Sequence, residues 1–128
     1  MKKSLLKIHD HYRKRVNSFL DSFLNSIPSS PNSDIQLRDV MKYSVLAGGK
    51  RFRPILTYTV ASLYDSEIEK ADSCASAIEL IHIYSLIHDD LPPMDNDDIR
   101  HNQPSNHKVF GEAQAILAGD GLQALHLV

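Results

Sequence analysis

Several features that would place a chain in a membrane or outside the cell are missing from this sequence. Cys74 is the only cysteine among the 128 residues, so no intrachain disulfide can form. No apolar run approaches the roughly 20 residues of a membrane span. The basic N-terminus is not followed by the apolar stretch of a signal peptide. We therefore expect a cytoplasmic protein without a membrane span.

An excess of charge of one sign is also missing. The 14 Lys and Arg residues nearly balance the 16 Asp and Glu residues, for a net charge of −2. The chain is 42% hydrophobic and 23% charged, which is typical of a globular protein and too apolar for a disordered one. Because the balance offers no general attraction to polyanions, we expect no nucleic-acid partner.

Hydrophobic periodicity predicts helices and no strands. Apolar residues recur at three- to four-residue intervals, and proline or glycine separates the periodic segments. Asp34 is suited to cap the second helix, and Gly48 and Gly49 are suited to end it. The fold class is all-α, with helices expected over about residues 5–26, 37–46, 54–64, 69–91 and 108–128 and a loop before the last.

The fourth predicted helix indicates a bundle larger than this chain. From Cys74 to Leu91 it is apolar around its whole circumference, as in a helix at the centre of a large bundle. The other helices could surround it only sparsely, and the last one has no capping signal before Val128. We therefore expect residues 1–128 to form the N-terminal portion of a single helical domain that is truncated here.

The strongest chemical signal is a cluster of five aspartates at the end of this apolar helix. Like charges 4 Å apart repel by about 1 kcal/mol in water and about 4 kcal/mol at a partly buried site. A cation would relieve this repulsion, and Mg²⁺ is a hard cation that bridges carboxylates to phosphates. A solvated acidic turn is the alternative. The cluster consists of Asp89, Asp90, Asp95, Asp97 and Asp98.

A second signal is the basic run at residues 48–54. Two glycines let the backbone turn freely, and three cations follow immediately before a predicted helix. Helix N-termini favour phosphate, and arginine binds it bidentately. The alternative is a basic surface loop. The three cations are Lys50, Arg51 and Arg53.

A third signal is the position of His82, seven residues before Asp89. Two helical turns separate them, so both lie on one face of the helix, with Ser85 between them. A histidine on an apolar helix is more often a core residue, but sharing a face with the acidic cluster favours a function. Further bases follow the acids from Arg100 to Lys108. An acidic segment, followed by a basic segment and then by a helix, is the order that a pocket for Mg²⁺ and diphosphate requires.

From about Leu37 to its end, the chain resembles the trans-prenyltransferases. The Gly-Gly-Lys-Arg-x-Arg-Pro run and the Asp-Asp-x-x-x-x-Asp motif occur in that family's order, and residues 110–113 and 117–120 resemble its next helix. The resemblance implies the isoprenoid synthase helical bundle. It also implies Mg²⁺-dependent condensation of isopentenyl diphosphate with an allylic diphosphate, either dimethylallyl or geranyl diphosphate. Two extra residues inside the aspartate motif, Pro92 and Pro93, are similar to an insertion in the bacterial-type farnesyl diphosphate synthases. This similarity implies farnesyl diphosphate as the product.

The resemblance also implies a role for each matching residue. The catalytic residues, which would hold Mg²⁺ and with it the allylic diphosphate, are Asp89, Asp90 and Asp95. The diphosphate of isopentenyl diphosphate would be bound by Lys50, Arg53 and His82, with Arg51 as a further candidate.

Four other positions matter in the same comparison. Arg100 would contact the allylic diphosphate. His101 stands where the family often has an arginine that binds isopentenyl diphosphate, and an imidazole is mostly neutral near neutral pH. Tyr84 and Ser85 occupy the positions that limit product length.

The resemblance further implies a homodimer and a second aspartate-rich motif in a C-terminal half. No such motif follows Asp120, so we expect this chain alone to be inactive. Three alternatives stay open: a non-catalytic subunit of a heteromeric prenyltransferase, an α-helical metal-dependent phosphohydrolase, and a structural helical fragment. The intact aspartates of the motif argue against a non-catalytic subunit. A phosphohydrolase would not explain the basic run at residues 48–54.

Overall fold

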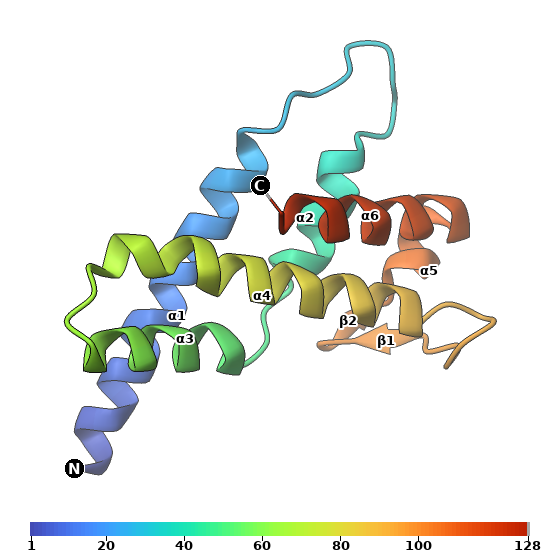
Figure 1. Ribbon diagram of the computed structural model, residues 1–128. Helices are drawn as coiled ribbons and strands as arrows, with labels where there is room; N and C mark the ends of the chain where they lie inside the picture. Colours follow the sequence, from blue (N-terminus) through green and yellow to red (C-terminus); the bar gives the residue numbers. More distant parts are fainter. Residues whose placement is uncertain (128) are drawn as a thin grey trace.

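The computed structural model describes residues 1–127 and confirms the all-α prediction (Figure 1). Two short strands form an antiparallel hairpin in which Ile99 pairs with Pro104 and Arg100 with Gln103. No helix in the described part of the chain is long and apolar enough to cross a membrane. The elements are α1 (Lys2–Asn25), α2 (Leu37–Val45), α3 (Phe52–Leu63), α4 (Ile68–Asp89), β1 (Ile99–Arg100), β2 (Gln103–Pro104), α5 (Asn106–Phe110) and α6 (Glu112–Leu125).

Helix α4 is the element against which the others pack (Figure 1). Helices α3 and α6 lie along it, and α1 crosses it. Each large apolar side chain buried in this way contributes about 1.5–3 kcal/mol. One side of α4 stays open, because Ile78 and Ile81 are 43% and 38% exposed. The fully buried aliphatic side chains include Val16, Leu20, Leu24, Val40, Val45, Leu80 and Leu122.

Three local features differ from the sequence prediction. The hairpin lies in the segment expected to be a loop. The last helix is split at Gly111, whose φ of 89° is left-handed and breaks the α-helical path between α5 and α6. Asp34 does not cap α2; Gln36 is the N-cap, and its own side chain bonds backward to the carbonyl oxygens of Ser30 and Ser33. Residue 128, the predicted end of the last helix, lies outside the described residues.

A buried polar triad ties α1, α3 and α4 together. The Asp72 carboxylate accepts hydrogen bonds from Arg15 Nε at 2.9 Å, Arg15 Nη2 at 2.8 Å and the Tyr58 hydroxyl at 2.6 Å. Burial alone raises the pKa of Asp72, but the bonds from Arg15 and Tyr58 outweigh it and the pKa is lowered. Burial, followed by the bond to Asp72, raises the pKa of Tyr58. The triad therefore fastens these three helices to one another.

Candidate functional site

A cleft lined mainly by basic side chains lies beside α4, with a volume of about 330 Å³. Four segments form it: the loop that follows α2, the first turn of α3, the middle of α4 and the tip of the hairpin. The structure therefore brings together all of the residues predicted to bind isopentenyl diphosphate. The lining residues are Gly48, Gly49, Lys50, Arg51, Phe52, Arg53, Glu79, His82 and His101.

The backbone of the cleft's loop requires its glycines. Gly48 and Gly49 have φ angles of 107° and 105°, which L side chains rarely adopt. A Cβ added at Gly49 would also lie 3.3 Å from His101 Cε1. His101 and Asn102 form the hairpin tip with φ angles of 51° and 62°, the left-handed pair of a tight two-residue turn. Loop and hairpin tip therefore meet at Gly49.

Arg51 differs from its basic neighbours because its side chain is buried. Its Nε donates to Asn17 Oδ1 at 2.8 Å, its Nη1 donates to Glu79 Oε1 at 2.9 Å, and its Nη2 donates to the Val45 carbonyl oxygen. The side chains of Arg51 and Glu79 are only 1% and 4% exposed. The guanidinium is thus held by the protein interior.

Lys50 and Arg53 are exposed on either side of Arg51. Neither has an ion-pair partner within residues 1–127. His82 is half-buried, and burial first, then the charge of Arg53, lowers its pKa. The cleft therefore offers two free cations and a neutral imidazole to an entering anion.

The acidic cluster lies at the C-terminal end of α4. The chain folds back there, so that the Asp95 N–H donates to the Asp89 carbonyl oxygen at 2.8 Å and the Asp97 N–H donates to that of Asp90 at 3.1 Å. The C-terminal end of a helix carries partial negative charge, so carboxylates at this end are unfavourable without a cation. The acidic loop is therefore a place where positive charge is stabilised.

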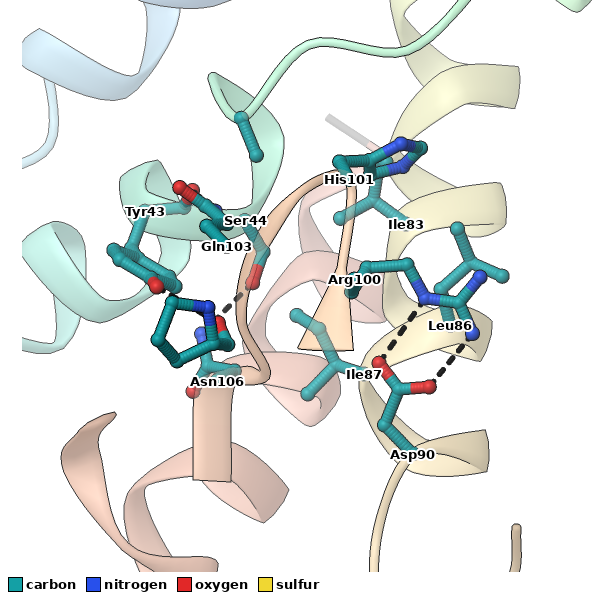
Figure 2. A pocket seen from close by; sticks show the side chains of 12 residues that line it. Tyr43, Ser44, Ile83, Leu86, Ile87, Asp90, Arg100, His101, Gln103 and Asn106 are labelled. Atoms are coloured by element: carbon teal, nitrogen blue, oxygen red, sulfur yellow. Dashed lines mark hydrogen bonds and ion pairs between the residues drawn. The ribbon is translucent and has the colours of Figure 1, made fainter. Parts of the chain in front are cut away.

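Part of that positive charge comes from the chain itself. Asp90 is only 2% exposed and accepts hydrogen bonds from Arg100 Nη2 at 2.6 Å and Nε at 3.2 Å (Figure 2). The hydrogen bond to Asp90 raises the pKa of Arg100. Asp98 pairs with Lys108 at 3.1 Å.

Asp89 and Asp95 are the aspartates of the predicted metal motif that have no ion-pair partner in the described part of the chain. Within residues 1–127 no three His, Cys, Asp or Glu side chains are gathered as a ready metal site. Mg²⁺ usually takes one or two carboxylates and completes its shell with substrate phosphates and water. Asp89 ends α4 and Asp95 is held close to it by the hydrogen bond between their main chains, so their two free carboxylates fit that pattern. Asp90 could join them only if Arg100 released it, so its role as a ligand stays a prediction.

The hairpin that separates the two regions is anchored to α2. The Tyr43 hydroxyl donates to the Pro104 carbonyl oxygen at 2.7 Å, and Asn106 Nδ2 donates to the Val40 carbonyl oxygen and to Ser44 Oγ, both at 2.9 Å. Figure 2 shows these side chains around a small pocket that Arg100 and His101 also line. The two residues thus stand on a fixed element.

Tyr84 and Ser85 lie away from the basic cleft. The Tyr84 ring is half-buried and meets the His88 ring edge-on, with centroids 5.7 Å apart. His88 in turn packs on α6, where a Cβ at Gly119 would lie 2.2 Å from its Nε2. Ser85 Oγ donates to the His82 carbonyl oxygen at 2.6 Å. Their roles in product length stay predictions.

Sequence reasoning overlooked Glu79 and Asn17, which hold the Arg51 side chain. A signal for Glu79 was available, since it is the one acidic residue between Asp72 and Asp89 on a mostly apolar helix. Acidic side chains are almost never fully buried without a partner, so a buried base was required. Nothing in the sequence pointed to Asn17.

Comparisons with known proteins show which family the chain resembles. The polyprenyl synthetase family profile matches residues 34–128. A farnesyl diphosphate synthase of Geobacillus stearothermophilus is 58% identical over 87 residues, 68% of this chain and 29% of the relative. The large subunit 1 of a heterodimeric, chloroplastic geranylgeranyl pyrophosphate synthase of Arabidopsis thaliana is 50% identical over 107 residues, 84% of this chain and 28% of the relative.

A solved structure shares the fold. The geranyltransferase of Legionella pneumophila superposes with a TM-score of 0.90 at 46% identity, and the match covers 98% of this chain and 42% of that one. The chain thus spans less than a third of the length of the two curated relatives and less than half of the solved chain.

Proposed function

This chain belongs to the polyprenyl synthetase family, and we propose that it carries the substrate-binding part of a Mg²⁺-dependent prenyltransferase. Its substrates would be isopentenyl diphosphate and an allylic diphosphate, dimethylallyl or geranyl. The observation that supports this best is the arrangement of two opposite charge regions around one hairpin. Arg100 pairs with the acidic loop, while the neighbouring His101 lines the basic cleft.

The basic cleft would take the diphosphate of isopentenyl diphosphate. Lys50 and Arg53 are exposed there and free of carboxylate partners in the described chain, so both can form charge-assisted hydrogen bonds to phosphate oxygens. His82 and His101 line the same cleft. An entering anion would favour the protonated form of His82 and so add to the attraction.

The acidic loop would receive the allylic diphosphate. Asp89 and Asp95 would hold Mg²⁺, which when bound supplies positive charge against the departing diphosphate. Arg100 would add hydrogen-bond donors at the same place. The allylic C–O bond breaks with its electron pair on the diphosphate, the alkene of isopentenyl diphosphate forms the new C–C bond, and a proton is lost. The apolar side of α4 would keep water from the carbocation.

Farnesyl diphosphate is the product that we propose, on the strength of Pro92, Pro93 and Tyr84. The printed names of the relatives include both farnesyl and geranylgeranyl synthases, so the comparisons support prenyl diphosphate synthesis in general. We also propose that the domain is completed by further helices on the open side of α4, where Ile78 and Ile81 are exposed, and that the complete enzyme is a homodimer.

Calorimetric titration of isopentenyl diphosphate into the 128-residue chain, without metal, tests the proposal. Lys50→Ala should weaken binding by about 10- to 100-fold, since a hydrogen bond to a charged group contributes about 1.5–3 kcal/mol. Lys70→Ala is the matched control, because Lys70 is an exposed lysine that pairs with Glu67 and lies outside the cleft. Equal affinities for wild type and Lys50→Ala would overturn the proposal.

Turnover is a separate question. With Mg²⁺, dimethylallyl diphosphate and isopentenyl diphosphate, we expect this chain alone to give no C10 or C15 product. The reason is the missing second aspartate-rich motif that the resemblance implies. Product formation by a homogeneous 128-residue chain would contradict this expectation.

A further inference from the structure

The most deeply buried ion pair in the described chain is that of Arg51 and Glu79. Their side chains are almost inaccessible, and desolvating two charges costs several kcal/mol per ion before their attraction repays it. Such a pair is therefore poor evidence of added stability. Its position offers another explanation, because both residues line the basic cleft.

The Arg51 side chain connects three elements to the loop. Its donors reach Asn17 on α1, the carbonyl oxygen of Val45 at the end of α2, and Glu79 on α4. The Arg51 backbone is left-handed, with a φ of 54°, and it is the N-cap of α3. A non-glycine residue keeps this conformation only when its surroundings hold it, and here the guanidinium bonds do so.

The neighbours of Arg51 in sequence are the two exposed cations of the cleft. Lys50 precedes it directly, and Arg53 follows two residues later in the first turn of α3. Fixing Arg51 therefore fixes the backbone from which both cations project. Glu79, in turn, would repel an anion in the cleft if the Arg51 guanidinium did not neutralise it.

We propose that Arg51 and Glu79 are a positioning pair that holds Lys50 and Arg53 in place for the diphosphate, and that Arg51 does not itself bind substrate. This inference rests on the proposed function of the cleft. It assigns the buried pair to binding rather than to stability.

Charge-conserving variants separate geometry from electrostatics. Arg51→Lys cannot reproduce the planar fork that reaches three partners, and Glu79→Asp is one methylene too short to keep its bond. Both should weaken binding of inorganic diphosphate by about 10- to 100-fold, the cost of losing one charge-assisted hydrogen bond from a displaced Lys50 or Arg53. The double variant should lose no more than the worse single variant, because the two residues act as one unit.

Asp72→Glu is the matched control. It perturbs another buried, hydrogen-bonded arginine–carboxylate pair without changing charge, and it lies outside the cleft. It should lower the melting temperature but leave the affinity for inorganic diphosphate unchanged. If Arg51 were a direct ligand, Glu79→Asp would free its guanidinium and leave affinity intact or improved, which would overturn the proposal. A loss of stability in both Arg51→Lys and Glu79→Asp without a loss of affinity would also overturn it.

Lys50→Ala distinguishes failure of this inference from failure of the proposed function. If Lys50→Ala also binds normally, the cleft is not the diphosphate site. If only Lys50→Ala binds weakly, the cleft assignment stands and the positioning pair is wrong.

A measurement on the wild-type chain covers the case in which the variants do not fold. The Arg51 Nε–H, which donates to Asn17, should give a slowly exchanging nitrogen-15 NMR signal. Inorganic diphosphate should leave that signal in place while the amide of Lys50 shifts. A large shift of the Arg51 Nε–H on titration would mean that the guanidinium binds the anion.

Discussion

Asp72→Asn tests the polar triad that fastens α1, α3 and α4 to one another. The wild-type carboxylate accepts three hydrogen bonds, two from the Arg15 guanidinium and one from the Tyr58 hydroxyl, at 2.6–2.9 Å. Asparagine keeps one oxygen acceptor but turns an amide N–H₂ toward a remaining donor. It therefore loses at least one charge-assisted bond and leaves the guanidinium without a counter-charge.

The magnitude follows from the burial of the pair. Breaking a fully buried ion pair costs about 3–5 kcal/mol. The Arg15 side chain is 29% exposed, so water can solvate part of it, and we expect about 2–3 kcal/mol, between one and two charged hydrogen bonds. With a urea dependence of about 1–3 kcal/mol per molar, the unfolding midpoint should fall by about 1 M.

Urea unfolding followed by circular dichroism is the assay. Asp10→Asn is the matched control, because Asp10 also bonds two cations, Arg13 and Lys14, but does so on the exposed surface. Its midpoint should stay at the wild-type value. If Asp72→Asn behaved like Asp10→Asn, the buried triad would not stabilise the fold and the reasoning would be refuted.

The pH dependence gives the same prediction a second test. The pKa of Asp72 is lower in the folded chain than its unfolded value of about 3.9, so the folded state favours the ionised carboxylate. Its contribution to the free energy of unfolding is complete above that unfolded value and is lost as pH falls through the folded pKa. The difference between wild type and Asp72→Asn should therefore shrink below about pH 4. A difference that stays constant in acid would contradict the assignment.

Three further predictions concern the site itself. His101→Arg should bind isopentenyl diphosphate more tightly than wild type, because His101 lines the cleft and a guanidinium there is always charged and can donate two parallel hydrogen bonds to a phosphate; an affinity no better than that of wild type in calorimetry would contradict this. Gly119→Ala places a methyl group 2.2 Å from His88 Nε2 and should cost about 1–3 kcal/mol in urea unfolding, so an unchanged midpoint would exclude the contact. In an active protein that contains this chain, Tyr84→Ala should extend products beyond C15 in chromatography of the dephosphorylated lipids, and an unaltered profile would assign product length elsewhere.

The helices could be predicted from the sequence because their signals are local. Apolar spacing and punctuation by proline or glycine located α1 to α4 to within a few residues. The split at Gly111 was missed, since the helical pattern continues on both sides and only the φ of that residue breaks it. The hairpin was missed because its strands have two residues each, too few for an alternating pattern to appear.

For the site, the sequence predicted which residue types are present and in what order. It could not predict which side chains pair with one another in the fold. Arg51 and Arg53 lie in one basic run, and the family resemblance favoured Arg53 as the ligand without a physical reason. The fold supplies the reason, because Asn17 and Glu79 come from distant segments and enclose the Arg51 guanidinium while Arg53 remains exposed. Likewise, the pairing of Asp90 with Arg100 depends on the path of the intervening loop.

The path of the loop between Asp90 and Arg100 also determines how the two proposed substrate sites are placed relative to each other. Arg100 and His101 are consecutive, so their Cα atoms are about 3.8 Å apart, yet one side chain pairs with the acidic loop and the other lines the basic cleft. Since the bonds from Tyr43 and Asn106 hold the hairpin region against α2, one peptide unit links the two regions with little freedom. A change in the hairpin turn should therefore weaken the binding of both substrates together. A change in the Arg51–Glu79 pair should weaken binding in the basic cleft alone.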